Sequence, residues 1–251
     1  MTVNVLWTGG WDSSFRLLQA CICERATVQP HYVIDHRRRS VQCEVRAMAS
    51  IKERIAERFP DARQRILPTV FYVRCEIPAN VAISASHAAL VARGHLGTQY
   101  EWIARLAQSA RISTLELSVH RDDRAHGFLR DVVSRDAHGR YSLAPNAAGP
   151  AATLFKGLVF PLFDMTKLDM AAAAREHAFA EILELTWFCA DPDRNMQPCG
   201  ACGPCRYTIG EGLARRVPRA NRVKAQVGRV YRGVGRRLLR WVTPRGLLRT
   251  T

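Results

Sequence analysis

The amino-acid sequence predicts an α/β fold in which a mostly parallel β-sheet carries helices on both faces. Short apolar segments of strand type alternate with helical patterns along most of the 251 residues. A glycine pair at 9–10 joins the first of these segments to the first helical pattern, as in a βαβ unit. Hydrophobic residues make up 47% of the chain, which is enough to build a sizeable core.

The elements follow in order along the chain. Helices are expected after the glycine pair, over 43–59 with its apolar residues on one face, from 100 to 110 and from 165 to 177. The segment from Asp136 to Pro150 is rich in Ala, Gly, Pro and Asn, and we expect a surface loop, either a flap over a site or a plain connection. Strands are expected at 3–7, 31–34, 67–73, 112–119 and 158–163.

The net charge of +15 is unevenly distributed. Residues 212–251 hold twelve Lys and Arg and no acidic residue, whereas residues 1–211 hold 25 basic and 22 acidic residues. Whatever residues 212–251 bind therefore need not be the substrate of residues 1–211. No apolar run approaches the ~20 residues of a membrane span, and the N-terminus shows no secretion signal, so a cytoplasmic location is expected.

The basic tail, 213–251, has the pattern of an amphipathic helix. Its apolar residues recur with helical spacing between Val223 and Val242, and arginines lie largely opposite them. Such a helix suits an anionic membrane surface, which would place the protein at the membrane periphery. Nucleic acid, a partner protein, or packing against its own domain or a dimer mate are the alternatives. Glycines at 228, 233 and 235 weaken an isolated helix.

The glycine loop lies at the carboxyl end of the first strand, where parallel sheets bind ligands. Glycine lets the backbone approach a ligand closely, hydroxyls add donors, and the following helix points its free N–H groups at the same place. These features predict an anion cradle, most naturally for phosphate, although the glycine pair could simply make a tight turn. Neither common phosphate motif, G-x-x-x-x-G-K-[ST] or G-x-G-x-x-G, is present. The loop comprises Thr8, Gly9, Gly10, Trp11, Asp12, Ser13 and Ser14.

Four clustered cysteines, Cys189, Cys199, Cys202 and Cys205, predict a metal site. The C-x-x-C spacing lets thiolates reach one tetrahedral zinc ion at ~2.3 Å, and four ligands fill its shell, so a structural role is favoured. An iron–sulfur cluster, or reduced cysteines without metal, are the alternatives. The remaining cysteines are scattered, and we expect them reduced and buried.

Two motifs carry a family resemblance that spans roughly residues 3–210. Thr8-Gly9-Gly10-Trp11-Asp12-Ser13 resembles the SGGxDS loop of the PP-loop ATP pyrophosphatases, with Thr for the first Ser. The second motif is similar to the 7-cyano-7-deazaguanine synthase family, and it comprises Val159-Phe160-Pro161-Leu162, Thr166-Lys167, Thr186-Trp187-Phe188-Cys189 and Cys199-Gly200-Ala201-Cys202-Gly203-Pro204-Cys205. The resemblance implies a Rossmann-like sheet of the adenine nucleotide alpha-hydrolase type over 1–185 and a zinc-binding segment over 186–212.

The resemblance also implies a reaction. Family members use two ATP, with Mg²⁺. The carboxylate of 7-carboxy-7-deazaguanine is adenylated and ammonia displaces AMP to give the amide; a second adenylation, on the amide oxygen, is followed by elimination to the nitrile. In this chain residues 8–14 and Asp35 would bind ATP, while Asp12, Asp122 and Lys167 would be catalytic; Asp122 and Lys167 could equally be solvated surface groups. We expect ATP, Zn²⁺ and Mg²⁺ as cofactors, a small-molecule carboxylate and ammonia as substrates, and a homodimer.

Three segments depart from the family pattern. Asp35-His36-Arg37-Arg38-Arg39-Ser40 stands where the family has D-Y-G-Q-R-H, and Ser118-Val119-His120-Arg121-Asp122 lacks the family's Gly-x-Asn. The third segment, 94–102, is built differently from the part of the family that recognises nucleotide and base. All three face the substrate in the family. A paralogue that adenylates a different acceptor is therefore the first alternative. A zinc-bearing adaptor for nucleic acid or membrane, without catalysis, is the second.

Overall fold

The computed structural model describes residues 2–94, 96–137 and 139–228. The chain forms two compact units. The sheet unit comprises Met1–Arg37 and Val41–Trp187, and the cysteine unit comprises Arg38–Ser40 and Phe188–Thr251. The predicted tail, 213–251, is helical from 219 to 228, and its remainder lies outside the described residues. Among the described residues, no helix is long and apolar enough to cross a bilayer.

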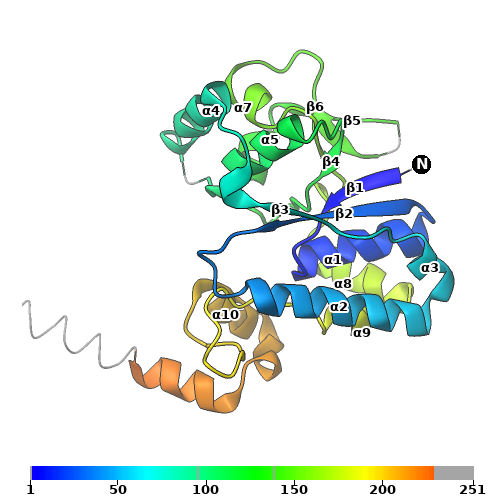
Figure 1. Ribbon diagram of the computed structural model, residues 1–251, viewed down its shortest axis with the longest axis vertical. Helices are drawn as coiled ribbons and strands as arrows, with labels where there is room; N and C mark the ends of the chain where they lie inside the picture. The colour runs from blue at the N-terminus through cyan, green and yellow to red at the C-terminus, as the bar shows by residue number, and fades with distance from the viewer. Residues whose placement is uncertain (1, 95, 138, 229–251) are drawn as a thin grey trace, which may run out of the picture. The chain divides into compact units, whose positions relative to one another are not determined.

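The sheet unit is built on a seven-stranded sheet with the order β3-β2-β1-β4-β7-β6-β5 (Figure 1). The first five strands in that order are parallel, and β6 and β5 add an antiparallel hairpin at one edge. The strands are β1 (Thr2–Leu6), β2 (Thr27–Ile34), β3 (Val70–Val73), β4 (Leu115–Glu116), β5 (Val133–Arg135), β6 (Tyr141–Leu143) and β7 (Leu158–Phe160). The α/β fold predicted from the sequence is confirmed.

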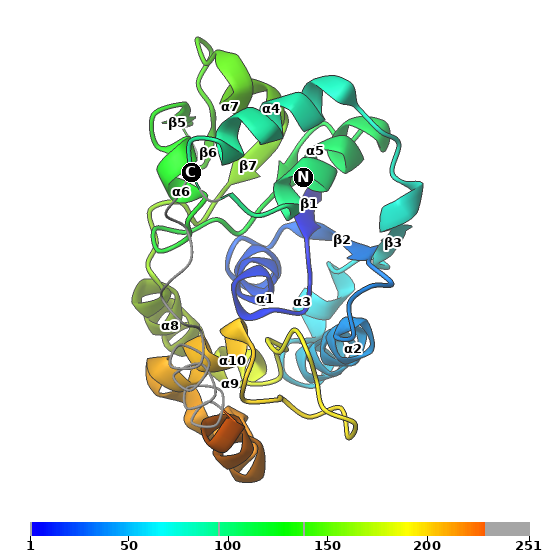
Figure 2. The same ribbon diagram turned by 90° about the vertical axis from the view of Figure 1, so that its left-hand side faces the viewer.

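Helices cover both faces of this sheet (Figures 1 and 2). One face carries α1 (Trp11–Leu18) with the π-helical turn η1 (Gln19–Cys23), α2 (Val41–Arg58), α3 (Pro60–Gln64), α8 (Lys167–Glu176) and α9 (Ala180–Leu183). The other carries α4 (Val81–Val91), α5 (Gln99–Ser109), α6 (His126–Leu129) and α7 (Gly149–Leu154). The short 3-10 turn η2 (Arg74–Glu76) follows β3. In the cysteine unit, α10 (Gly203–Thr208) is followed by the turns η3 (Ile209–Leu213) and η4 (Ala214–Arg216).

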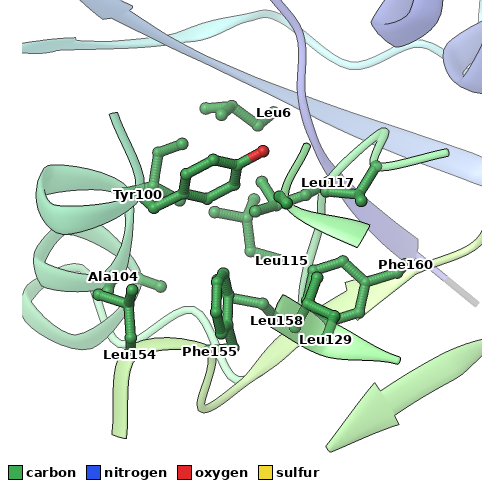
Figure 3. Close-up of a cluster of buried hydrophobic side chains, with 14 of the residues drawn as sticks. Leu6, Tyr100, Ala104, Leu115, Leu117, Leu129, Leu154, Phe155, Leu158 and Phe160 are labelled. Carbon is green, nitrogen blue, oxygen red and sulfur yellow. The ribbon is translucent and has the colours of Figure 1, made fainter. Parts of the chain in front are cut away.

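Each face of the sheet buries its own core. Val3 and Val5 of β1 contribute to the core beneath α1 and α2, whereas Leu6 contributes to the opposite one. A parallel strand buried on both sides reads as a continuous apolar run, which is why the sequence showed it clearly. Figure 3 shows the core that contains Leu6. In this core the ring of Tyr100 meets the ring of Phe155 edge to face, with the ring centroids 5.7 Å apart.

Two local predictions were wrong, and one helix was not predicted. The expected loop from Asp136 to Pro150 contains β6, which pairs with β7, and the start of α7. The expected strand at 112–119 is hydrogen-bonded as a strand only over β4, because the chain leaves the sheet after Leu117. Helix α4 was missed because its sequence, VAISASHAALV, spreads small and apolar residues around the helix and shows no apolar stripe.

A buried ion pair ties α1 to the centre of the sheet. Arg16 is 1% exposed, and its Nε lies 2.6 Å from Oε2 of Glu116 on β4, which is 3% exposed. A second bond joins Arg16 Nη2 to Glu116 Oε1 at 3.1 Å, and Glu24 binds the outer side of the guanidinium. Burial alone would lower the pKa of Arg16, but the hydrogen bonds to Glu24 and Glu116 outweigh it and raise that pKa. The guanidinium therefore stays charged inside the fold.

We predict that Arg16→Met destabilises the protein by about 3–5 kcal/mol, because Glu116 would be left as an unpaired buried carboxylate. Urea denaturation, read as a shift in midpoint at constant slope, measures the change. Arg54→Met is the matched control. Its ion pair with Glu57 is 44% and 64% exposed, so its loss should cost less than about 1 kcal/mol. Equal midpoint shifts for the two variants would contradict the structural role of the buried pair.

Candidate functional site

The strand order of the sheet reverses between β1 and β4. From β1 the chain passes to β2 on one side, and β4 pairs with β1 on the other, with Val5 opposite Glu116. In open parallel sheets ligands bind at the carboxyl ends of the strands beside such a reversal. The glycine loop after β1 and the segment after β4 both begin there, so the topology brings two sequence-distant loops to one place.

The glycine loop has a backbone that only glycine fits. Gly9 has φ +68°, and a Cβ on it would lie 2.8 Å from the carbonyl oxygen of Glu44 on α2. The carbonyl of Gly9 accepts a hydrogen bond from the backbone N–H of Trp187 at 2.8 Å. Trp187 belongs to the second of the two family-like motifs, so these motifs meet at this loop. The loop is thus held from two sides before any ligand arrives.

The hydroxyls of Thr8 and Ser13 face each other across the loop. Their oxygens are 3.1 Å apart, and Ser13 Oγ also accepts from the backbone N–H of Thr8 at 3.2 Å. Ser13 Oγ donates to the Gly10 carbonyl at 3.3 Å, and Gly10 N–H donates to Thr8 Oγ1 at 3.4 Å. These bonds are long for hydroxyl groups. A bound anion can replace them at small cost.

Two predicted ligand residues make hydrogen bonds within the protein. Ser14 is fully buried, and its hydroxyl accepts from the indole N–H of Trp7 at 2.9 Å, so Ser14 braces the loop from the core. Asp35, at the end of β2, accepts from Arg74 Nη1 at 2.5 Å and from the backbone N–H of Arg37 at 3.1 Å. Both positions therefore have structural roles that the sequence did not indicate.

Trp11, also predicted to bind the cofactor, lies at the start of α1. Its ring stacks on Phe15 with centroids 6.1 Å apart and planes 8° apart. Phe15 is fully buried, so this stack anchors the first turn of α1 on the core. The orientation of that turn fixes where Asp12 points.

His120 is the functional candidate that the sequence analysis missed. It is 5% exposed and follows the last apolar residue after β4. Its Nε2 lies 3.8 Å from Asp12 Oδ1, and its Nδ1 accepts a hydrogen bond from the backbone N–H of Asp122 at 3.2 Å. An accepting Nδ1 requires the ring proton to be on Nε2, facing Asp12. A histidine directly after a parallel strand was the available signal.

The predicted catalytic residues gather around this histidine. The side chain of Asp122 lies 3.9 Å from His120 Nδ1, and it accepts from the backbone N–H of Lys167 at 3.3 Å. Lys167 is the first residue of α8, whose N-terminus is fixed by a capping box between Thr166 and Asp169. Asp12, Asp122 and Lys167, chosen from distant parts of the sequence, therefore lie in one linked group.

The neighbouring Asp123 has a different role. Its carboxylate accepts from the backbone N–H of Ala125 at 2.9 Å and is hydrogen-bonded to the hydroxyl of Tyr100. Burial first, and then the charge of Asp123, raise the pKa of Tyr100, so the phenol stays protonated as a donor. Asp123 anchors the loop, whereas Asp122 faces His120 and Lys167.

In the cysteine unit, the four predicted ligands form a cluster suited to a single ion. All four sulfurs lie within 4.8 Å of one another. The Cys189–Cys202 and Cys199–Cys205 sulfur separations are 3.8 and 3.9 Å. A tetrahedron with metal–sulfur bonds of ~2.3 Å has edges of about 3.8 Å. A four-iron cluster binds each thiolate to a different iron and would hold the sulfurs farther apart.

The backbone around these sulfurs is arranged for thiolates. Cys199 Sγ accepts from the backbone N–H groups of Ala201 and Cys202 at 3.4 and 3.3 Å. A hydrogen bond from Cys205 lowers the pKa of Cys189 to about 5 and raises the pKa of Cys205. One thiolate is thus already favoured, and a bound metal would complete the deprotonation. Gly200, with φ +74°, turns the knuckle where a Cβ would lie 2.8 Å from the Asn221 carbonyl.

Comparison with known proteins adds little at this stage. No protein-family model matches the chain, and no curated protein sequence matches it significantly. Among solved structures, a predicted subunit of tRNA methyltransferase from Methanocaldococcus jannaschii is 16% identical, with a TM-score of 0.35 over 70% of this chain and 74% of that one. The U34-tRNA thiolase NcsA from Methanococcus maripaludis, solved with its [4Fe-4S] cluster, is 14% identical, with a TM-score of 0.39 over 100% of this chain and 78% of that one. At these scores neither structure bears on what this chain does.

We predict that Gly9→Ala lowers the free energy of unfolding by about 2 kcal/mol or more, because it combines a left-handed backbone with the contact to Glu44. Gly127→Ala is the control, since a Cβ there meets nothing within 4 Å, and it should change stability by less than about 1 kcal/mol. Urea denaturation compares the two. A Gly9→Ala variant as stable as wild type would show that the loop does not need its glycine.

We also predict one metal ion per chain, bound by the cysteine cluster. Inductively coupled plasma mass spectrometry of the purified protein measures it. Cys202→Ser should remove most of the metal, whereas Cys75→Ser, at an exposed cysteine outside the cluster, should retain it. Iron with acid-labile sulfide, or equal metal content in both variants, would contradict a single-ion site.

Proposed function

We propose that the sheet unit binds ATP at the β1–β4 crevice and uses it to adenylate a carboxylate. One observation carries the proposal. A hydroxyl- and glycine-lined loop at the end of β1, which carries Asp12, meets the buried His120 and a second carboxylate, Asp122, from the segment after β4, where the strand order reverses. A loop of this kind suits phosphate, and the reversal is where parallel sheets bind nucleotides.

The loop residues would hold the phosphates. The backbone of Gly9 and Gly10 and the hydroxyls of Thr8 and Ser13 offer donors at the first turn of α1, where the helix dipole favours negative charge. In adenylation a carboxylate oxygen attacks the α-phosphorus, the bond to the β-phosphate oxygen breaks and pyrophosphate leaves, so negative charge builds up on the phosphate oxygens. Donors held by a fixed backbone and aimed at that charge stabilise the transition state.

Two carboxylates beside a triphosphate require a cation. Asp12 and Asp122 flank His120 on opposite sides of its ring, and on their own they would repel the phosphates. Magnesium prefers one or two carboxylates together with phosphate oxygens, which matches this set. We therefore assign one of these carboxylates, Asp12 or Asp122, to Mg²⁺, and Lys167, at the N-terminus of α8, to the developing phosphate charge.

The cysteine cluster would hold zinc. Four thiolates at tetrahedral spacing select Zn²⁺ among common cellular metals, and a filled shell leaves no open position for catalysis. Its contribution is to fold the cysteine unit, which has few buried apolar residues of its own among those described.

For the acceptor we propose 7-carboxy-7-deazaguanine with ammonia as the nitrogen donor, which would place the chain among C–N ligases of the deazapurine pathway. The support is the two-part motif resemblance, whose halves meet where Trp187 binds the Gly9 carbonyl. The segment at 36–40 and the His120 loop differ from the family pattern, so another carboxylate is the second candidate.

ATP–pyrophosphate exchange tests the proposal. With 7-carboxy-7-deazaguanine present, labelled pyrophosphate should enter ATP, and mass spectrometry with ammonia should detect the amide and nitrile. Ser13→Ala should lower exchange about 10-fold or more, because one donor to the phosphates is lost. Ser109→Ala, an exposed serine on α5, should leave exchange unchanged.

The outcomes separate the alternatives. If pyrophosphate exchange occurs but no nitrile forms, the protein catalyses adenylation but does not make 7-cyano-7-deazaguanine. Absence of exchange with 7-carboxy-7-deazaguanine, together with absence of ATP binding by calorimetry, would exclude the adenylation reaction and favour a non-catalytic adaptor.

We further predict that His120→Asn lowers the exchange rate about 100-fold while the KM for ATP changes by less than about threefold, because the ring orders Asp12 and Asp122 rather than binding the base. His87→Asn on α4, which loses one bond to the Gly97 carbonyl, is the matched control. A large rise in KM with an unchanged rate would instead place His120 in ground-state nucleotide binding.

A further inference from the structure

The cysteine unit carries a basic surface that the adenylation reaction does not use. Its described residues, 38–40 and 188–228, hold nine basic side chains and three acidic ones. Eight of the nine are arginines. The sheet unit, in contrast, holds 21 basic and 19 acidic residues and is almost neutral. Even with four thiolates and a divalent ion, which contribute −2 together, the described part of the cysteine unit stays positive.

A polar cavity of 660 Å³ opens on this surface beside Cys199. Its acidic groups are engaged within the unit: Asp191 pairs with Arg39 at 2.7 Å, and Asp193 accepts from Asn221 Nδ2 at 2.7 Å. That hydrogen bond, with further bonds from the backbone of residues 195 and 197, lowers the pKa of Asp193. Arg194 and Lys224 are exposed on the cavity lining, so it offers an anion two long cationic side chains.

Aromatic groups accompany the arginines. Tyr207, on α10, is 66% exposed and follows the exposed Arg206. Arg216 lies over the ring of Phe188, with its guanidinium carbon 5.0 Å from the centroid. Arginine binds phosphate through a planar fork and stacks on planar rings, and exposed aromatic rings stack on unpaired bases. The described part of the cysteine unit thus carries both kinds of side chain that bind single-stranded nucleic acids, cations for phosphates and an exposed ring for a base.

We propose that the cysteine unit binds single-stranded nucleic acid, with phosphates in the cavity on Arg194 and Lys224 and a base stacked on Tyr207. A cavity of 660 Å³ has the size of a nucleotide site, and the phosphates of a flexible single strand enter a concave site more readily than those of a stiff duplex. An anionic membrane fits less well. Bilayer insertion needs large apolar side chains on the basic face, and the described part of this unit exposes only Tyr207, Val223 and Val227 among large hydrophobic residues.

The test uses the full chain and fluorescence anisotropy with a fluorescein-labelled strand of about 20 nucleotides, as RNA, as DNA of the same sequence and as duplex. The double variant Arg194→Gln, Lys224→Gln should weaken single-strand binding at least about fivefold and reduce the salt slope by about 1.4, since each lost phosphate contact contributes about 0.7. Tyr207→Ala should weaken binding about fivefold or more with the slope unchanged, because it removes stacking alone. Comparing the affinities for the RNA strand and the DNA strand shows which of the two the protein prefers.

Arg93→Gln, Arg130→Gln is the matched control, because it removes two exposed charges from the sheet unit. It should leave affinity and salt slope within about 20% of wild type. Metal content of the Tyr207 variant verifies that the cysteine cluster is intact.

The proposal is overturned if the cysteine-unit and control variants behave alike, since binding would then follow net charge or residues 229–251. It is also overturned if duplex binds as tightly as single strand. A third result would also overturn it. In that case the Arg194→Gln, Lys224→Gln variant no longer sediments with phosphatidylserine vesicles, but it still binds RNA with the wild-type affinity. None of these results affects the adenylation reaction, which pyrophosphate exchange measures separately.

Discussion

The buried bond between Arg16 and Glu116 fixes the geometry on which the candidate site depends. Arg16 lies one helical turn after Asp12 on α1, and Glu116 lies four residues before His120 along β4 and its extension. The 2.6 Å bond between Arg16 and Glu116 therefore sets the position of α1 relative to β4. This relative position brings Asp12 within 3.8 Å of His120. A charged pair this deeply buried adds little net stability. Its directional, two-point hydrogen bonding instead specifies a single register between helix and strand.

The site is assembled from segments that are far apart in the sequence and individually unremarkable. The glycine loop contributes hydroxyls and a helix N-terminus, the loop after β4 contributes His120 and Asp122, and α8 contributes Lys167. Trp187 closes the arrangement by binding the Gly9 carbonyl. Such a site has charge of both signs and fixed donors at the strand-order reversal, and these are the requirements of nucleotide chemistry. The cysteine unit satisfies different requirements, with its own metal cluster and its own basic surface.

The sequence predicted those features that depend on local patterns. The α/β order, the glycine turn and the cysteine spacing each follow from a few neighbouring residues, and the structure confirms the fold and brings the four cysteines together. It did not predict His120, because the importance of that residue comes from Asp12, 108 positions away. Nor did it predict that Ser14 faces the core, since helical periodicity does not show which serine meets the indole of Trp7. The hairpin β5–β6 was hidden because its pairing with β7 and its packing on the core join segments that are separate in the sequence.

A crystal structure with the non-hydrolysable analogue α,β-methylene-ATP and Mg²⁺ tests the central claim most directly. The account predicts the triphosphate on the backbone of Gly9 and Gly10 and the Ser13 hydroxyl, with the metal ion bound by Asp12 or Asp122 beside His120. Nucleotide bound elsewhere on the sheet unit, or a glycine loop that keeps its Thr8–Ser13 contact at 3.1 Å and excludes phosphate at saturating analogue, would contradict it.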